Sequence, residues 1–365
     1  MSHFESATPS SVVRVSLPSK PPFGYDIPIG RGLRHCAGEM IAAVHKPCRA
    51  LLLTDDTVEV LYADDVTASL AKIGFSVVRH VVPHGEASKS AGTLFSLLEA
   101  MAKEHMTRSD LLIALGGGVV GDLGGFASAV YQRGIPFVQI PTTLLAMVDA
   151  SVGGKTAIDL EAGKNLVGAF HQPSLVICDP DCLSTLPANV FSDGMAEVIK
   201  YAFINDKVLF EALLREVHDC MEEIIRLCVE DKRALVETDE TDVGARQLLN
   251  LGHTVGHAIE ACSDFTISHG SAVAEGMVII TRAAVKMGIC EAKTLSSLVA
   301  LLVKYGLPTE CPFTAEQLYA VALSDKKRAG GTITLVVPFG VADSRLVTVP
   351  VDALEGYIRA GLAED

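Results

Sequence analysis

Residues 110–122 read Asp-Leu-Leu-Ile-Ala-Leu-Gly-Gly-Gly-Val-Val-Gly-Asp, an apolar run that enters a glycine cluster. The run Asp110–Leu115 has the length and composition of a buried parallel strand. Gly116, Gly118 and Gly121 then form a GxGxxG pattern, whose backbone amides can hold a pyrophosphate at the start of a helix. A tight glycine turn without a ligand is the alternative interpretation. The pattern favours a nucleotide-binding α/β fold.

The glycine pattern lacks the acidic residue that usually follows about 20 positions later on the next strand. That position falls near Pro141, where the chain holds no acid. Asp55 and Asp56 stand instead at the end of an earlier predicted strand, where they can bind an adenosine ribose. Their negative charge disfavours a 2′-phosphate, so we expect NAD rather than NADP.

Strand-like and helix-like segments alternate through the N-terminal half of the chain. We expect an edge strand at Tyr25–Ile29 and further strands at Arg49–Thr54, Ser76–Val82, Asp110–Leu115, Gly134–Ile140 and Ser174–Cys178, with helices at Val58–Ile73 and Lys89–Glu104. This alternation predicts a parallel sheet with helices on both faces. From about Leu183 the periodicities become long and helical. We expect helices at 191–204, 208–236, 247–262, 270–287, 294–305 and 351–363, and a β-hairpin arm at 331–338.

The length of 365 residues and the hydrophobic content of 49% allow two domains with cores of their own. The predicted fold class is an α/β N-terminal Rossmann-like nucleotide-binding domain followed by an all-α C-terminal domain. We expect a disordered or extended N-terminus at 1–22, the NAD-binding α/β domain at 23–182, and a helical metal- and substrate-binding domain at 183–365.

The formal net charge of -14 disfavours nucleic acid as a partner, because phosphate neutralisation requires a basic surface. No run approaches about 20 apolar residues, so we expect no contact with a membrane. The nine cysteines include no CxxC pair and are typical of free thiols in a reducing compartment. These features together predict a cytoplasmic protein.

Residues 246–260 read Arg-Gln-Leu-Leu-Asn-Leu-Gly-His-Thr-Val-Gly-His-Ala-Ile-Glu. If this stretch is one helix, its polar residues form a single stripe made of Arg246, Asn250, His253, His257 and Glu260. A solvated helix face is the simple explanation, but such faces normally carry Lys, Glu and Gln. Gly252 and Gly256 are poor helix formers, which suggests that something approaches the backbone closely. The stripe therefore predicts the wall of a cleft.

Ligands for a metal ion can be sought around this helix. Glu197 and Lys200 are three residues apart on another predicted helix, and His269 precedes a third. Glu197, His253 and His269 would form a set of two imidazoles and one carboxylate, which is typical of a catalytic Zn²⁺ site with an open position. Whether these residues meet, and whether one helical histidine moves protons instead, is left open by the sequence.

The segment 141–156 joins the two predicted halves and ends in Gly153-Gly-Lys-Thr. It lacks the GxxxxGK[ST] spacing of a phosphate-binding loop for nucleoside triphosphates. We expect a loop that presents Asp149 and Lys155 to a cleft.

Six motifs occur in order along the chain: Pro-His-Gly-Glu-Ala-Ser-Lys (83–89), Gly-Gly-Gly-Val-Val-Gly-Asp (116–122), Pro-Thr-Thr-Leu-Leu-Ala-Met-Val-Asp (141–149), Gly-Met-Ala-Glu-Val-Ile-Lys (194–200), Leu-Gly-His-Thr-Val-Gly-His-Ala-Ile-Glu (251–260) and Asp-Lys-Lys (325–327). With them, the chain closely resembles the 3-dehydroquinate synthase family of sugar phosphate cyclases, from about Asp55 to Lys327.

The resemblance implies a role for each residue that matches a family motif. The implied metal ligands are Glu197, His253 and His269. The implied catalytic residues are Asp149, Lys155, Lys200, Lys232, Arg246, Asn250 and His257. Further substrate-binding residues are Arg133, which in the family reaches the phosphate from a neighbouring subunit, Asn165 and Lys326, or Lys327 if the register differs by one. The implied NAD-binding residues are Asp55, Glu86, Lys89, Gly117, Gly118, Asp122, Thr142, Thr143, Lys164 and Thr185.

The activity implied by the resemblance is the conversion of 3-deoxy-D-arabino-heptulosonate 7-phosphate, a phosphorylated sugar acid, to 3-dehydroquinate in the shikimate pathway. The family uses NAD and Zn²⁺, with Co²⁺ as a possible substitute, and forms homodimers. It oxidises the substrate transiently, eliminates phosphate, returns the hydride and closes the carbocycle by an aldol step. The lysines and arginines at motif positions would then bind the phosphate and the carboxylate of the substrate.

One position departs from the family pattern. The usual Gly-Glu-Ala-Val-Ala after the last metal-binding histidine reads Gly-Ser-Ala-Val-Ala here, with Ser271 in place of the acid. A cyclase for sedoheptulose 7-phosphate is therefore the first alternative. A metal-dependent polyol or alcohol dehydrogenase and a non-catalytic NAD-binding protein are the others.

Overall fold

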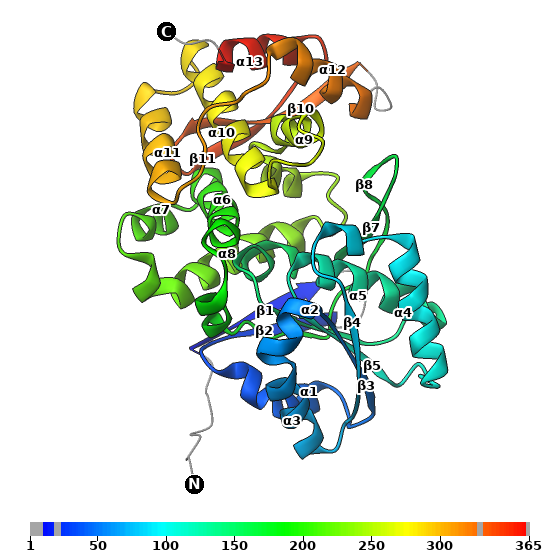
Figure 1. The fold of residues 1–365 in the computed structure, drawn as a ribbon. Helices are drawn as coiled ribbons and strands as arrows, with labels where there is room; N and C mark the ends of the chain where they lie inside the picture. The colour runs from blue at the N-terminus through cyan, green and yellow to red at the C-terminus, as the bar shows by residue number, and fades with distance from the viewer. Residues whose placement is uncertain (1–9, 18–22, 327–330, 363–365) are drawn as a thin grey trace. The chain divides into compact units, whose positions relative to one another are not determined.

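The computed structural model describes residues 10–17, 23–326 and 331–362. Its contacts divide the chain into two compact units (Figure 1). The first unit contains the chain up to Leu186 together with Lys232–Thr241, and the second contains Pro187–Asp231 and the chain from Asp242 onward. The sequence predicts a boundary after residue 182 between an NAD-binding domain and a metal- and substrate-binding domain. This assignment of functions stays a prediction.

The first unit is built on a seven-stranded sheet with the order β1-β2-β9-β6-β5-β3-β4. The strands are β1 (Ser11–Leu17), β2 (Phe23–Ile29), β3 (Arg49–Asp55), β4 (Ser76–Val82), β5 (Leu111–Gly116), β6 (Phe137–Pro141) and β9 (Leu175–Val176). Only β1 and β2 pair antiparallel; the other neighbours are parallel. The edge position expected for Tyr25–Ile29 is wrong, because β1 pairs along the whole of β2.

The helices of the first unit follow the strands of the parallel sheet, as the alternation predicts. They are α1 (Ala37–Val44), α2 (Asp56–Val58), α3 (Asp64–Ile73), α4 (Ala91–Lys103) and α5 (Gly118–Val130), with short turns at η1 (Leu33–Cys36), η2 (Glu59–Ala63), η3 (Glu86–Ser88), η4 (Tyr131–Arg133), η5 (Ala146–Ala150) and η6 (Pro180–Thr185). The buried strand residues Leu53 and Leu112 share one core with Leu97 of α4 and Leu123 of α5. This core fixes the helices against the sheet and sets the strand ends that carry polar residues.

A two-stranded hairpin in the first unit was not expected from the sequence. It consists of β7 (Lys155–Leu160) and β8 (Gly163–Phe170). Most residues of β8 are exposed, so the segment lacks the apolar run by which the sheet strands were found.

The second unit is mostly helical. Its helices are α6 (Ala188–Ile204), α7 (Lys207–Leu213), the first part of α8 (Met221–Thr238), α9 (His253–Cys262), α10 (His269–Lys286), α11 (Ala292–Lys304), α12 (Ala315–Lys326) and α13 (Ala353–Leu362), with turns at η7 (Val217–Cys220) and η8 (Ala245–Asn250). The expected hairpin arm is present as β10 (Thr332–Gly340) and β11 (Asp343–Pro350). Helix α12 was not expected.

The single helix expected at Val208–Val236 is wrong, because α7 ends at Leu213 and α8 begins at Met221. Lys304 Nζ donates to the carbonyl oxygens of Leu213, at 2.9 Å, and Arg215, at 2.6 Å. Carbonyl groups at a helix end need such partners. The lysine lies far along the chain, so local periodicity gave no sign of the break.

The helix expected at Gln247–Cys262 is also interrupted. Arg246 and Asn250 lie in η8, and α9 begins only at His253, after Gly252 with a φ of +79°. A Cβ on Gly252 would lie 2.6 Å from Met277 Cγ and 2.7 Å from the Val273 oxygen, both on α10. The close approach suggested by this glycine is thus the approach of a neighbouring helix, and the polar stripe is carried by a turn followed by a helix.

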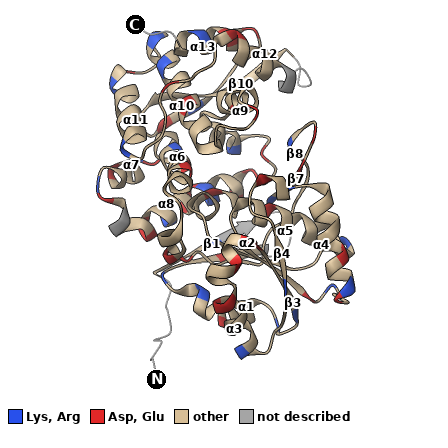
Figure 2. Cartoon of the chain, viewed as in Figure 1, with Lys and Arg blue, Asp and Glu red and all other residues tan. Residues whose placement is uncertain are grey.

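No helix within the described ranges is both long and apolar enough to cross a membrane. Acidic and basic residues are interspersed along the elements of both units (Figure 2).

Candidate active site

Three helices of the second unit bring the expected metal ligands together. Glu197 comes from the buried face of α6, and His253 and His269 begin α9 and α10. Glu197 Oε1 lies 3.5 Å from His253 Nε2 and 3.5 Å from His269 Nε2. The donor atoms of the three residues all lie within 4.8 Å of one another. Such spacing and chemistry fit a single divalent cation.

The second nitrogen of each imidazole has a partner that orients the ring. His253 Nδ1 lies 3.1 Å from the Leu251 carbonyl oxygen, and His269 Nδ1 lies 3.3 Å from Glu260 Oε2. Partners of this kind fix which nitrogen faces a metal ion. Glu260 belongs to the polar stripe of the sequence, where orienting a neighbouring histidine is the role expected of it, and its contact with His269 agrees with that expectation.

The two histidines differ in the pKa that their surroundings impose. Burial lowers the pKa of His253 to about 3, against the attraction of Glu197. Burial also acts to lower the pKa of His269, but its bonds to Glu197 and Glu260 outweigh that effect and raise it to about 10. His253 is therefore a neutral donor at pH 7, whereas a cation at Nε2 of His269 must displace a proton.

Two cationic side chains are buried in the same unit. Lys200 forms an ion pair with Glu197 one turn away on α6, and each of these side chains is only 1% exposed. Arg246 in η8 is 1% exposed. Positive charge held in a low-dielectric interior attracts anionic groups more strongly than charge in water does.

The remaining expected residues of the second unit surround these groups. His257 is exposed on α9, one turn after His253, and the two ring centroids are 5.4 Å apart. Asn250 ends η8. Lys326 is the last residue of α12, and its side chain, like Lys327, lies outside the described parts.

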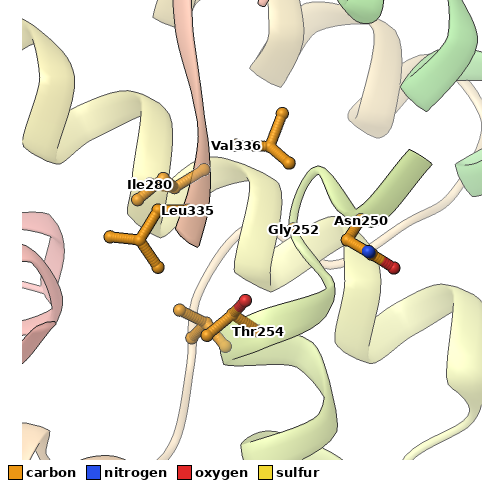
Figure 3. A pocket seen from close by; sticks show the side chains of 7 residues that line it. Asn250, Gly252, Thr254, Ile280, Leu335 and Val336 are labelled. Atoms are coloured by element: carbon orange, nitrogen blue, oxygen red, sulfur yellow. The ribbon is translucent and has the colours of Figure 1, made fainter. Parts of the chain in front are cut away.

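A pocket in the second unit lies beside Asn250 and is lined otherwise by Gly252, Thr254, Val255, Ile280, Leu335 and Val336 (Figure 3). Its volume of about 10 Å³ is room for a single water molecule. The lining is mostly apolar and includes none of the metal-ligand candidates, so this pocket is not a substrate site.

In the first unit, the glycine pattern stands where the sequence places it, between β5 and α5. Gly117 is the N-cap of α5, and no side chain caps the first amides of the helix. A Cβ on Gly121 would lie 2.6 Å from Gln139 Oε1 on β6, so this glycine allows the helix to pack closely on the sheet. The loop can therefore offer backbone N–H groups to a phosphate.

Expected NAD-binding residues form a polar network near this loop. Lys89 Nζ lies 2.7 Å from Asp122 Oδ2 and 3.8 Å from Glu86 Oε1, and it donates to Asn165 Oδ1. Burial raises the pKa of Asp122 to about 6, against the attraction of Lys89. Asp159 Oδ1 accepts a hydrogen bond from the backbone N–H of Asn165 at 2.7 Å. Asp159 was not expected from the sequence, because it lies on β7, a strand that the sequence pattern did not predict.

Lys232 and Asp149, from distant parts of the sequence, also meet in the first unit. Lys232 Nζ lies 3.0 Å from Asp149 Oδ1 and donates to the Asp149 carbonyl oxygen at 2.6 Å. Lys155, expected beside them, is an exposed residue at the start of β7.

The other expected residues of the first unit lie on loops and strand ends. Thr142 follows β6 and is buried, and Thr143 Oγ1 accepts a bond from the Ala146 amide at 3.2 Å. Asp55 Oδ1 caps α2 through the amides of Thr57 and Val58, which leaves the expected ribose contact to its other oxygen. The rest are Gly118 at the start of α5, Arg133 in η4, Lys164 on β8 and Thr185 in η6.

Another group missed from the sequence lies at the start of α10. Ser268 Oγ donates to Asp193 Oδ1 at 2.6 Å and lies 2.8 Å from Ser271 Oγ. Ser271, where the family has an acid, therefore belongs to a hydroxyl and carboxylate network next to His269. Asp193 lies on α6, directly before the motif at 194–200. That position was the only sign in the sequence that Asp193 belongs near the site.

A glycine loop on a parallel sheet, in a chain with a helical unit that gathers a glutamate and two histidines, is consistent with the class of sugar phosphate cyclases. Among solved structures, 2-epi-5-epi-valiolone synthase from Streptomyces hygroscopicus, with NAD⁺ and Zn²⁺ bound, is similar with a TM-score of 0.84 and 27% identity, covering 94% of this chain and 98% of that chain.

Sequence comparison gives the family. The models of the 3-dehydroquinate synthase N-terminal and C-terminal regions match residues 79–193 and 194–328. The 3-dehydroquinate synthase of Streptococcus suis is 42% identical over 353 residues, which cover 94% of this chain and 99% of the relative. That of Caulobacter vibrioides is 43% identical over 357 residues, with coverages of 93% and 96%. The chain belongs to the 3-dehydroquinate synthase family, and the predicted resemblance is confirmed.

Proposed function

We propose that this protein is a phosphate-eliminating lyase of the shikimate pathway that converts 3-deoxy-D-arabino-heptulosonate 7-phosphate to 3-dehydroquinate and phosphate. The observation that carries the proposal is the meeting of Glu197, His253 and His269 next to Lys200, in a chain that belongs to the family. This reaction has no net redox change. The NAD that it uses must therefore stay bound and be regenerated within each turnover.

We infer that Zn²⁺, or Co²⁺ in its place, is held by Glu197 Oε1 and the Nε2 atoms of His253 and His269. Two imidazoles and a carboxylate are the donor set of many catalytic zinc sites. The partners at Nδ1 support this assignment, because Leu251 and Glu260 leave both Nε2 atoms facing the glutamate.

We infer that NAD binds the first unit. The uncapped start of α5 fits a pyrophosphate, and the acid Asp55 at the carboxyl end of β3 fits a ribose. Thr142 and Thr143 follow strand β6, which pairs with β5, and Lys89 and Asp122 form an ion pair close to the glycine loop.

When bound, the cation supplies Lewis-acid polarisation of a substrate hydroxyl, and NAD supplies a reversible hydride acceptor. The chain itself has to bind two anionic groups and move protons. Lys200 and Arg246 present buried positive charge to the substrate anions, and Asn250 offers a neutral amide. His257 accepts and returns the hydroxyl proton, because it is an exposed imidazole one turn from His253.

In the first unit, Lys232 makes two contacts with Asp149 in the turn η5. These contacts keep η5 in one arrangement for substrate binding. Lys155, Asn165 and Lys326 complete the proposed set of substrate contacts.

We further propose a cytoplasmic homodimer. Arg133 is exposed in the turn η4, so its side chain is accessible to a second copy of the chain. The nine free cysteines suit a reducing compartment.

A cyclase for sedoheptulose 7-phosphate is the second candidate, favoured by Ser271, which departs from the family pattern. The buried cations Lys200 and Arg246 argue for the substrate that carries a carboxylate as well as a phosphate.

The two candidates separate in one assay. Purified protein with its metal content measured is offered each sugar phosphate, and phosphate release is followed together with NADH absorbance. We expect release from the carboxylate-bearing substrate alone, without net NADH. Turnover only of sedoheptulose 7-phosphate would refute the proposal, and steady accumulation of NADH would indicate a dehydrogenase.

The proton-transfer role is tested with His257→Ala. We expect this variant to keep the cation at Glu197, His253 and His269 but release phosphate slowly, whereas His253→Ala and Glu197→Ala lose that cation and activity together. Full activity in a metal-free variant would contradict the metal assignment.

A further inference from the structure

The imidazole of His269 lies between two groups of potential metal ligands. Its Nε2 is 3.5 Å from Glu197 Oε1, and its Nδ1 is 3.3 Å from Glu260 Oε2. His257 stands three residues before Glu260 on α9. The donor atoms of His257, Glu260 and His269 all lie within 4.8 Å of one another.

This second group has the chemistry and spacing of a cation site. A histidine and a glutamate three residues apart share one face of a helix, an arrangement that metal sites in helical proteins use repeatedly. With ligand bonds of about 2.0–2.2 Å, the ligands of tetrahedral Zn²⁺ stand about 3.3–3.6 Å apart. The separation of 3.3 Å between His269 Nδ1 and Glu260 Oε2 is within that range.

We propose that His257, Glu260 and Nδ1 of His269 form a second divalent-cation site, which shares His269 with the first. A cation at Nδ1 replaces the proton that this nitrogen holds, and the proton leaves to the buffer. With both sites filled, the ring of His269 bridges the two cations as an imidazolate.

The second site binds more weakly than the first for two reasons. His257 is exposed, so its side chain must be ordered on binding, whereas Glu197 and His253 are already held in place. The second cation also has to remove the last ring proton of His269, which a single bound cation does not require.

Filling the second site occupies the imidazole of His257. On the proposed function, this group carries a proton during turnover, so excess Zn²⁺ slows phosphate release. The concentration that halves the rate then equals the concentration that half-fills the second site, in protein whose first site is already loaded.

The test measures metal binding without substrate. Protein loaded at the first site is titrated with Zn²⁺ by equilibrium dialysis, and bound metal is counted by mass spectrometry. We expect about two equivalents in the wild type and about one in His257→Ala, which loses one ligand of the second site only. Glu260→Gln also loses a ligand of the second site, together with the partner that orients His269 for the first site. His84→Ala is the matched control, because His84 pairs with Asp56 at 2.7 Å and is not one of these ligands.

Retention of the second equivalent at wild-type affinity in His257→Ala, or a single equivalent in the wild type, would overturn the proposal. If Glu260→Gln also weakens the first site, His257→Ala decides, because it leaves all three ligands of the first site in place. The outcome is independent of the substrate: a protein without cyclase activity would still bind two equivalents, and an active cyclase that binds only one would refute this site alone.

Discussion

Glu260 Oε2 lies 3.3 Å from Nδ1 of His269, and this contact aims Nε2 of the same ring at Glu197. The glutamate is near the end of α9 and the histidine begins α10, so the loop between the two helices sets the geometry. A carboxylate behind a metal-binding imidazole orients the ring and raises its basicity.

We expect Glu260→Ala to weaken Zn²⁺ binding at the first site about 10- to 100-fold, because the ring of His269 loses its orienting partner. Competition with a chromogenic chelator measures the dissociation constant. Glu310→Ala, at an exposed carboxylate, is the control. Equal affinities in the two variants would show that Glu260 does not act on the metal site.

Lys200→Met is expected to destabilise the metal-free protein more than the loaded one. Without the lysine, the carboxylate of Glu197 stays buried with less compensation, at a cost of about 3–5 kcal/mol, and a bound cation offsets part of it. Chemical unfolding with and without Zn²⁺ gives the two free energies of unfolding. The same loss in both states would mean that the cation does not neutralise Glu197.

Gly252→Ala tests the break before α9. The left-handed backbone at φ +79° costs a residue with a side chain about 1–3 kcal/mol, and the clash with Val273 and Met277 adds about 1–3 kcal/mol. Gly288→Ala is the matched control, since its φ is +71° and an added Cβ meets nothing within 4 Å. If the free energy of unfolding falls equally in both variants, the close packing of α10 against Gly252 does not contribute to the loss of stability.

Glu275 is expected to make stability depend on pH. Burial raises the pKa of this α10 carboxyl from 4.5 to about 7, although its bond with Cys311 opposes the shift. Because the folded state holds the proton more tightly, the contribution of this group to stability is present below pH 4.5 and is lost as the pH rises to about 7.

The melting temperature of Glu275→Gln should therefore exceed that of the wild type more at pH 8 than at pH 4.5. Thermal unfolding at both pH values measures the difference, with Glu310→Gln as the exposed control. A difference that does not change with pH would show that Glu275 titrates alike in the folded and unfolded chain.

Most of the parallel sheet could be predicted because each central strand is a short, fully buried apolar run. Arg49–Thr54 and Asp110–Leu115 were recognised in this way, and the sheet places them next to each other. Strands β7 and β8 were missed because a hairpin with an exposed face carries no such run.

The functional groups of the chain could be predicted from its sequence. Motif spacing named Glu197, His253 and His269, and the glycine pattern after β5 indicated a nucleotide loop, because residue type and local periodicity fix which groups are available and how each element begins. Tertiary packing decided the rest. Contact with α10 at Gly252 broke the expected helix before His253, and the loop between α9 and α10 brought Glu260 to His269. Such contacts join residues on separate elements, and their energies depend on distances that no local pattern encodes.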